Sequence, residues 1–183
     1  AYDLKEAYDP EEQNRLWQAR RRAAIVAESG KGNKKALPFI EDTVVHPLKL
    51  ADYLVMLYKI MRKYKVEFSV WGHAGDGNVH LQPFLDLGDS KDAEKLFKIA
   101  EEVYDAVVGL GGALTAEHND GLMRLPFLKK QFSEPVLQTF QEVKNIFDPQ
   151  DIFNPHKKTG AEIDFIKKLL RKDYNIEING RQT

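Results

Sequence analysis

A glycine-rich bend between two alternating segments is the feature that most constrains how this chain can fold. Residues 67–71 and 78–84 alternate apolar and polar side chains, as half-buried β-strands do. The bend that joins them, 72–77, contains three glycines and an aspartate, a composition typical of tight turns. The pattern therefore predicts two neighbouring strands joined by a tight turn.

Helical patterns surround this pair of strands. Each has apolar residues at helical spacing, and several begin at a proline or an aspartate. The predicted helices run from Pro10 to Gly30, from Pro47 to Lys65, from Asp89 to Gly111, over 135–147 and over 161–170, and a further strand is expected over 39–45. Strands interleaved with long helices indicate an α+β domain, with helices packed on one face of a mostly antiparallel sheet. We expect this domain to cover 1–170, and we expect 171–183 to be a tail or a linker.

Composition and charge exclude several functional classes. The chain has no cysteine, which removes disulfides, thiolate zinc sites, iron–sulfur ligation and thiol catalysis from this segment. Its formal net charge of −1 produces no global field that would favour nucleic acid or an anionic membrane. No apolar run approaches the roughly 20 residues that span a bilayer, and no strand is followed by a Gly-x-Gly-x-x-Gly turn for a dinucleotide. We therefore expect a cytoplasmic protein with no nucleic-acid partner and no membrane span.

Two histidines flank the glycine-rich bend. A tight turn can bring the imidazoles of His73 and His80 to one side, and neutral imidazole is the commonest protein ligand for a borderline divalent cation. Two ligands hold such an ion weakly, and Glu117 could supply a third while leaving positions open for substrate. His118 would point the other way in an extended segment and would suit a general base. Each residue also has an ordinary explanation, because histidines near strand ends often only hydrogen-bond at the surface and Asp76 beside glycine is usual in turns.

Three segments of the chain carry recognisable signatures. They are Gly72-His73-Ala74-Gly75-Asp76-Gly77-Asn78-Val79-His80, the stretch 111–121 with Glu117-His118, and Phe147-Asp148-Pro149 followed by Asn154-Pro155-His156-Lys157. Together they resemble the three signatures of the C-terminal domain of FAD-linked oxidases, flavoproteins such as D-lactate, glycolate and D-2-hydroxyglutarate dehydrogenases. A single motif of this kind is weak, whereas three in order are specific, and the resemblance extends from Leu16 to Lys157. It implies a ferredoxin-like cap domain, with FAD bound mainly by an N-terminal domain of the same polypeptide.

The resemblance also implies roles for individual residues. His73, His80 and Glu117 are similar to the family's metal ligands, with zinc or manganese as the expected ion, and His118 matches the base that takes the hydroxyl proton of the substrate. Other positions match contacts to substrate or cofactor: Arg20 for the substrate carboxylate, Gln82 for a polar substrate contact, and Asn78 and Asn154 for FAD. A guanidinium suits the first of these tasks because it can bind a carboxylate through two parallel hydrogen bonds.

The sequence departs from the family pattern at several positions. Ala116 and Asn119 stand where glycine is usual, and Ile40 stands where the hydroxyglutarate branch has a substrate-binding lysine. These changes bear on the identity of the substrate more than on the class of reaction. Segments 38–43 and 121–128 look most like a bacterial branch whose FAD half is also fused to an iron–sulfur domain, and any cluster would then lie outside this cysteine-free sequence.

We therefore predict the substrate- and metal-binding domain of a flavin-dependent dehydrogenase that oxidises a small D-2-hydroxy acid to the 2-oxo acid by hydride transfer to FAD. Its expected partners are the FAD-binding domain of the same polypeptide and an iron–sulfur domain or other electron acceptor, and the isolated chain should be inactive. Two alternatives stay open. A stand-alone divalent-metal hydrolase or lyase would use the same histidines and Glu117 without flavin, and a non-catalytic binding module would leave the metal site empty.

Overall fold

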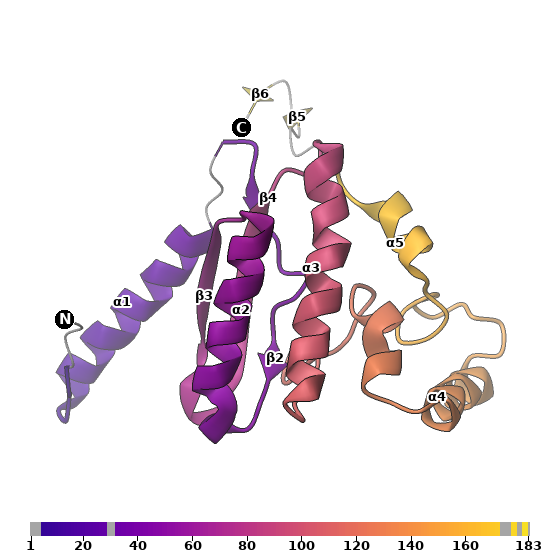
Figure 1. Cartoon of the computed structure of the whole chain (residues 1–183), viewed down its shortest axis with the longest axis horizontal. Helices are drawn as coiled ribbons and strands as arrows, with labels where there is room; N and C mark the ends of the chain where they lie inside the picture. Colours follow the sequence, from indigo (N-terminus) through magenta and orange to yellow (C-terminus); the bar gives the residue numbers. More distant parts are fainter. Residues whose placement is uncertain (1–4, 29–31, 173–176, 179–180, 183) are drawn as a thin grey trace.

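The structure is a computed structural model that describes residues 5–28, 32–172, 177–178 and 181–182. Within this part of the chain, an antiparallel sheet is covered on one face by helices α2 and α3, so the predicted α+β class is confirmed (Figure 1). The helices are α1 (Pro10–Glu28), α2 (Leu50–Tyr64), α3 (Ser90–Gly109), α4 (Glu134–Phe147), α5 (Ile163–Leu169) and the 3-10 helices η1 (Pro47–Lys49), η2 (Ala74–Asp76) and η3 (Leu125–Lys130). The strands are β1 (Lys35–Ala36), β2 (Thr43–Val44), β3 (Phe68–His73), β4 (Asn78–Leu85), β5 (Glu177–Ile178) and β6 (Arg181–Gln182).

Strand β4 is the centre of the main sheet. β3 pairs antiparallel along one edge of it, with Trp71 opposite His80 and His73 opposite Asn78. Along the other edge, β1 pairs with the C-terminal end of β4 and β2 pairs with its N-terminal end. The predicted pair of strands is therefore confirmed, and the tight turn between them contains η2.

Alternation along β4 sorts its side chains between the two faces of the sheet. Leu81 and Leu85 are fully buried in the hydrophobic core beneath α2 and α3. Asn78, His80 and Gln82 take the alternate positions, so their side chains point to the opposite face. These three polar residues are also buried. The sheet thus separates an apolar core from a polar face, and the candidate site lies on the polar face.

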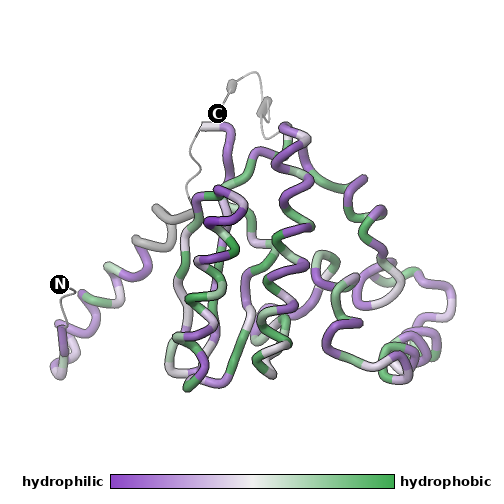
Figure 2. The backbone as a smooth tube through the Cα atoms, in the orientation of Figure 1, coloured by the Kyte–Doolittle hydropathy of each residue, from purple (hydrophilic) through white to green (hydrophobic). Residues whose placement is uncertain are grey.

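Helices α2 and α3 pack side by side and supply much of the core. Figure 2 shows hydrophobic and hydrophilic residues mixed along both helices, as expected when one side of a helix is buried. The predicted start of α3 is confirmed, because the Asp89 side chain accepts a hydrogen bond from the Lys91 amide. Its predicted glycine end is also confirmed, since Gly111 has φ 72°. The fully buried side chains of the two helices include Tyr53, Leu57, Met61, Ile99, Val103, Tyr104 and Val107.

The strand predicted over 39–45 is much shorter than expected. Only Thr43 and Val44 form β2, because the residues before them lie in a turn and Asp42 has φ 72°, a left-handed conformation that interrupts an extended chain. Strand β1, which was not predicted, is also only two residues long. Both differences arise at the part of the sheet that borders the candidate site.

Two further expectations concern location and domain boundaries. No helix in the described part of the chain is both long and apolar enough to cross a bilayer. The predicted tail, 171–183, is described only at 171–172 and in β5 and β6, which pair with each other. The boundary at residue 170 and the cytoplasmic location therefore stay predictions.

Gly77 closes the tight turn, and its replacement should destabilise the domain. It has φ 70°, and a Cβ atom there would lie 1.9 Å from the backbone oxygen of Val45. We expect Gly77→Ala to lower the free energy of unfolding by more than about 2 kcal/mol, measured by urea denaturation. Gly75→Ala is the matched control, because a Cβ in that position meets nothing within 4 Å. Equal losses in the two variants would contradict this account of the turn.

Candidate functional site

His80 is held by the central strand of the sheet. It lies in β4 and is only 3% exposed, with Nδ1 2.8 Å from Glu41 Oε2 and Nε2 3.2 Å from Glu117 Oε1. His73 ends β3 and places its Nε2 3.4 Å from the same Glu117 oxygen. The centroids of the two rings are 5.7 Å apart. The turn therefore brings both histidines to one side, as the glycine-rich bend predicts.

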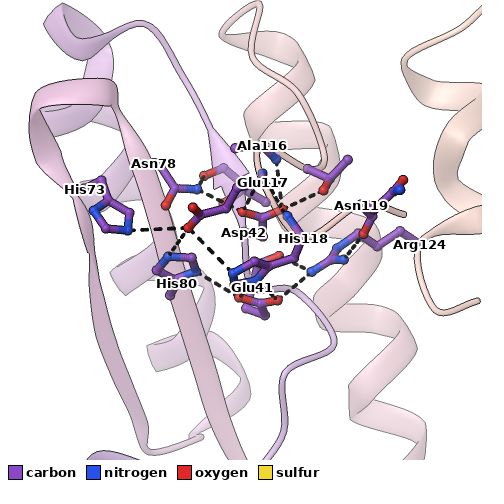
Figure 3. A network of polar contacts seen from close by, with 12 residues as sticks. Glu41, Asp42, His73, Asn78, His80, Ala116, Glu117, His118, Asn119 and Arg124 are labelled. Atoms are coloured by element: carbon purple, nitrogen blue, oxygen red, sulfur yellow. Dashed lines mark hydrogen bonds and ion pairs between the residues drawn. The ribbon is translucent and has the colours of Figure 1, made fainter. Parts of the chain in front are cut away.

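Glu117 and His118 come from the loop that follows α3. The imidazole of His118 stacks on that of His80, with ring centroids 5.0 Å apart, and its Nε2 lies 3.6 Å from Glu117 Oε1. Three imidazole Nε2 atoms therefore surround one carboxylate oxygen (Figure 3). The loop consists of bends and is not extended. His118 consequently lies on the same side as Glu117, and the expectation that it points the other way is wrong.

The donor atoms of this cluster fit a divalent cation. One ligand atom from each of Asp42, His80, Glu117 and His118 lies within 4.8 Å of the others. The Asp42 oxygens already accept several hydrogen bonds, so the imidazoles and Glu117 are the donors left for an ion. His73 adds a further imidazole beside Glu117. A mixed nitrogen and oxygen set of this kind suits zinc or manganese.

Asp42 holds the loop that carries Glu117 and His118. Its Oδ2 accepts hydrogen bonds from the Thr115 hydroxyl at 2.6 Å and from the backbone amides of Ala116, Glu117 and His118 at 2.9 to 3.1 Å. Burial alone would raise the pKa of Asp42, but these hydrogen bonds lower it to about 2. One fully buried, ionised side chain therefore sets the path of the loop.

Glu41, the preceding residue, contacts two of the histidines. Its carboxylate lies 2.8 Å from His80 Nδ1 and 2.8 Å from His118 Nδ1. The buried Arg124 donates to Glu41 Oε1 at 2.9 Å and to the Glu41 backbone oxygen at 2.7 Å. Burial raises the pKa of Glu41, but the hydrogen bonds to both imidazoles and the charge of Arg124 outweigh it and hold the pKa below its ordinary value.

Sequence reasoning did not assign Glu41, Asp42 or Arg124 to the site. A signal for the two acids was present, because they interrupt the apolar face of the strand predicted over 39–45. Two adjacent acids in a buried segment need partners, and such partners are found most often at binding and catalytic sites. Arg124 carried no comparable signal, since its position relative to Glu41 depends on the tertiary fold.

A cleft of about 760 Å³ opens over the cluster. Arg20 from α1 and Gln82 from β4 line this cleft together with Trp71, so both predicted substrate contacts lie beside the histidines. The full lining is Arg20, Ala36, Pro38, Glu41, Trp71, His73, His80, Gln82, Glu117 and His118. The cleft therefore brings together one guanidinium, one amide and the histidine–glutamate cluster.

The two asparagines expected to contact FAD are not in the lining of the cleft. Asn78 is buried and its Nδ2 donates to Asp42 Oδ1 and to the Thr43 backbone oxygen, while its Oδ1 has no hydrogen-bond partner among the described residues. Asn154 is exposed in the segment after α4, with φ 50°. Neither is among the described residues that line the cleft. Their contact with FAD stays a prediction.

Comparison with known proteins shows the family of the chain. Residues 1–158 match the family described as "FAD linked oxidases, C-terminal domain". A D-2-hydroxyglutarate dehydrogenase of Haemophilus influenzae is 35% identical over 144 residues, which cover 78% of this chain and 14% of the relative. The glycolate oxidase subunit GlcD of Bacillus subtilis is 30% identical, and a D-lactate dehydrogenase of Archaeoglobus fulgidus is 32% identical, each over 86% of this chain and 33% of its own length.

The fold and the site define an α+β domain that presents a histidine–carboxylate cluster in a polar cleft. The chain belongs to the family of FAD-linked oxidase C-terminal domains, as its three signatures predict. It spans between 14% and 33% of the length of these three relatives, which are named as oxidoreductases of hydroxy acids.

The hydrogen bonds at Asp42 predict a pH-dependent contribution to stability. The pKa of Asp42 is lowered on folding from 3.8 to about 2, so the ionised side chain stabilises the fold above about pH 4 and this contribution is lost as the pH falls towards 2. We expect Asp42→Asn to lower the free energy of unfolding at neutral pH by about 2 to 3 kcal/mol. The variant keeps a residue that tolerates left-handed φ, but its amide nitrogen would face donor groups.

The measurement is denaturant unfolding of both proteins across this pH range. The difference between wild type and Asp42→Asn should shrink as the pH falls from about 4 towards 2. Asp89→Asn is the matched control, because asparagine caps a helix as well as aspartate does. If Asp42→Asn is as stable as wild type at neutral pH, the hydrogen bonds between Asp42 and the loop do not stabilise the fold.

Proposed function

We propose that this chain is the substrate- and metal-binding domain of a flavin-dependent dehydrogenase that oxidises a small D-2-hydroxy acid to the 2-oxo acid. The observation that carries the proposal is the convergence of three imidazole Nε2 atoms on one Glu117 oxygen, inside a cleft that Arg20 also lines. The names of the relatives, which act on hydroxyglutarate, glycolate and lactate, support the substrate class. FAD would be held mainly by other parts of a longer polypeptide.

In this proposal His73, His80 and Glu117 hold the cation. His80 is the anchor because the sheet fixes it, while His73 and Glu117 are about half exposed and can adjust to an ion of preferred geometry. When bound, the cation would lower the pKa of the substrate's hydroxyl group and FAD would accept the hydride from the α-carbon. Zinc and manganese both fit the nitrogen and oxygen donors of this set.

Arg20 and Gln82 would orient the substrate. The guanidinium of Arg20 lines the cleft from α1 and can bind the substrate carboxylate through two hydrogen bonds. Gln82 lies on β4 two residues after His80, so its amide points to the same face of the sheet. A hydroxy acid held by both groups would have its hydroxyl directed towards the histidines.

His118 would accept the proton of the substrate's hydroxyl at Nε2. Its side chain is half exposed, so that both substrate and water can reach it. The hydrogen bond between Nδ1 and Glu41 raises the pKa of His118, which makes the imidazole a stronger base. Deprotonated His118 has a free lone pair for this transfer, and solvent can then take up the proton.

Metal binding by the isolated chain tests the ligand set. We expect wild type purified without chelator to bind zinc or manganese, measured by elemental analysis and by isothermal titration calorimetry. The His73→Ala/His80→Ala double variant should lose more than about 100-fold in affinity, since even the loss of an outer-shell partner of a metal ligand costs 10- to 100-fold. Full metal occupancy in the double variant would overturn the assignment. His46→Ala is the control, because His46 caps η1 and is not among the described residues that line the cleft.

Flavin reduction in the FAD-loaded protein tests the role of His118. His118→Asn should slow reduction of FAD by the hydroxy acid by about 10²- to 10⁴-fold, because a general base contributes this much to the rate. The variant should keep its metal, because in this proposal His118 is not a metal ligand. Loss of the metal together with activity would identify His118 as a ligand instead. The isolated chain should reduce no dye with lactate, glycolate or hydroxyglutarate, and dye reduction without an added flavoprotein would contradict the proposal.

A further inference from the structure

We propose that Glu41 is a positioning residue. It accepts hydrogen bonds from the Nδ1–H groups of both His80 and His118 and so orients the two Nε2 atoms towards Glu117. The roles of the two histidines as ligand and base rest on the proposed function, whereas their orientation by Glu41 does not. Figure 3 shows the Glu41 carboxylate beneath the two stacked imidazoles, with Glu117 on their other side.

The contacts of Glu41 join two distant segments at one carboxylate. Oε2 lies 2.8 Å from Nδ1 of His80, which belongs to β4. Nδ1 of His118, which belongs to the loop after α3, lies 2.8 Å from Oε1 and 3.0 Å from Oε2. Glu41 is 8% exposed, so water does not compete freely for its oxygens. By contrast, each Nε2 atom is 3.2 Å or more from Glu117, which is about half exposed.

Hydrogen-bond complementarity then fixes the tautomers. Arg124 can only donate, and it donates to Glu41 Oε1 at 2.9 Å, so this carboxylate is held in its ionised, acceptor-only form. Both imidazoles must therefore supply the hydrogen from Nδ1. A neutral imidazole carries one hydrogen, which leaves a lone pair on Nε2 of His80 and on Nε2 of His118. A ligand and a base both need that lone pair.

Replacing Glu41 by glutamine tests this orientation, because a glutamine amide can accept hydrogen bonds at only one of the two positions that the carboxylate oxygens occupy. In Glu41→Gln the amide oxygen must take the Oε1 position, since Arg124 donates there. The amide nitrogen then takes the Oε2 position, faces His80 Nδ1 and can only donate to it. His80 should switch to the tautomer with its hydrogen on Nε2, where that hydrogen would block an ion.

The experiment is long-range ¹H–¹⁵N correlation spectroscopy of the histidine rings in the metal-free chain at about pH 9, above the ordinary imidazole pKa. In wild type, His80 and His118 should both be Nδ1–H tautomers, and in Glu41→Gln the signals of His80 should change to those of the Nε2–H tautomer. His73, which makes no contact with Glu41 among the described interactions, should keep its tautomer. A wild-type spectrum with Nε2–H in either residue, or an unchanged His80 in the variant, would overturn the proposal. If the variant does not fold, the wild-type spectrum decides.

Zinc titration of the same proteins provides a second readout. Glu41→Gln should bind zinc about 10- to 100-fold more weakly than wild type, the usual effect of losing an outer-shell partner of a metal ligand. Glu102→Gln is the matched control, because Glu102 also accepts two side-chain hydrogen bonds, from Lys63 and Tyr64, but lies outside the cleft lining. The two proposals can fail separately. Nδ1–H tautomers without binding of either zinc or manganese would contradict the proposed function, whereas zinc binding that Glu41→Gln does not weaken would contradict the role of Glu41.

Discussion

The site depends on the sharp bend of the backbone at Asp42. Its left-handed φ of 72° sends two consecutive carboxylates to different tasks. Asp42 accepts hydrogen bonds from backbone amides of the loop that carries Glu117 and His118. Glu41 makes hydrogen bonds with the imidazoles of His80 and His118. A regular strand through this segment would put adjacent side chains on opposite faces of the sheet and could not direct both acids to the same cluster.

The two halves of the cluster are held with different rigidity. His80 lies in the central strand, with a neighbouring strand on each edge, and is almost completely buried. Glu117 and His118 lie in an irregular loop and are about half exposed, although Asp42 fixes the backbone beneath them. The buried His80 fixes the position of the site in the domain. The exposed side chains of Glu117 and His118 leave room for a ligand to approach them.

Local patterns predicted the fold well and the site in part. The alternation of β3 and β4, the glycine turn and the helical periodicities depend on neighbours in sequence, and each was found. The glycine-rich turn predicted that His73 and His80 lie on one side, whereas Glu117 was expected as a third ligand and from the resemblance to the family. The parts that sequence did not predict, the orientation of His118 and the contacts of Glu41, Asp42 and Arg124, all depend on hydrogen bonds between segments far apart in the chain. No local periodicity encodes such bonds.

The balance of charge in the site has a consequence for the order in which ligands arrive. Glu41, Asp42 and Glu117 are three carboxylates gathered around the imidazoles, whereas two arginines lie near them, the buried Arg124 and the cleft-lining Arg20. An excess of negative potential attracts a metal ion and repels an organic anion. In a protein with the proposed function, the carboxylates would oppose the attraction of Arg20 for a hydroxy-acid anion, and a bound cation would offset their negative charge. Electrostatics would then favour binding of the cation before binding of the substrate.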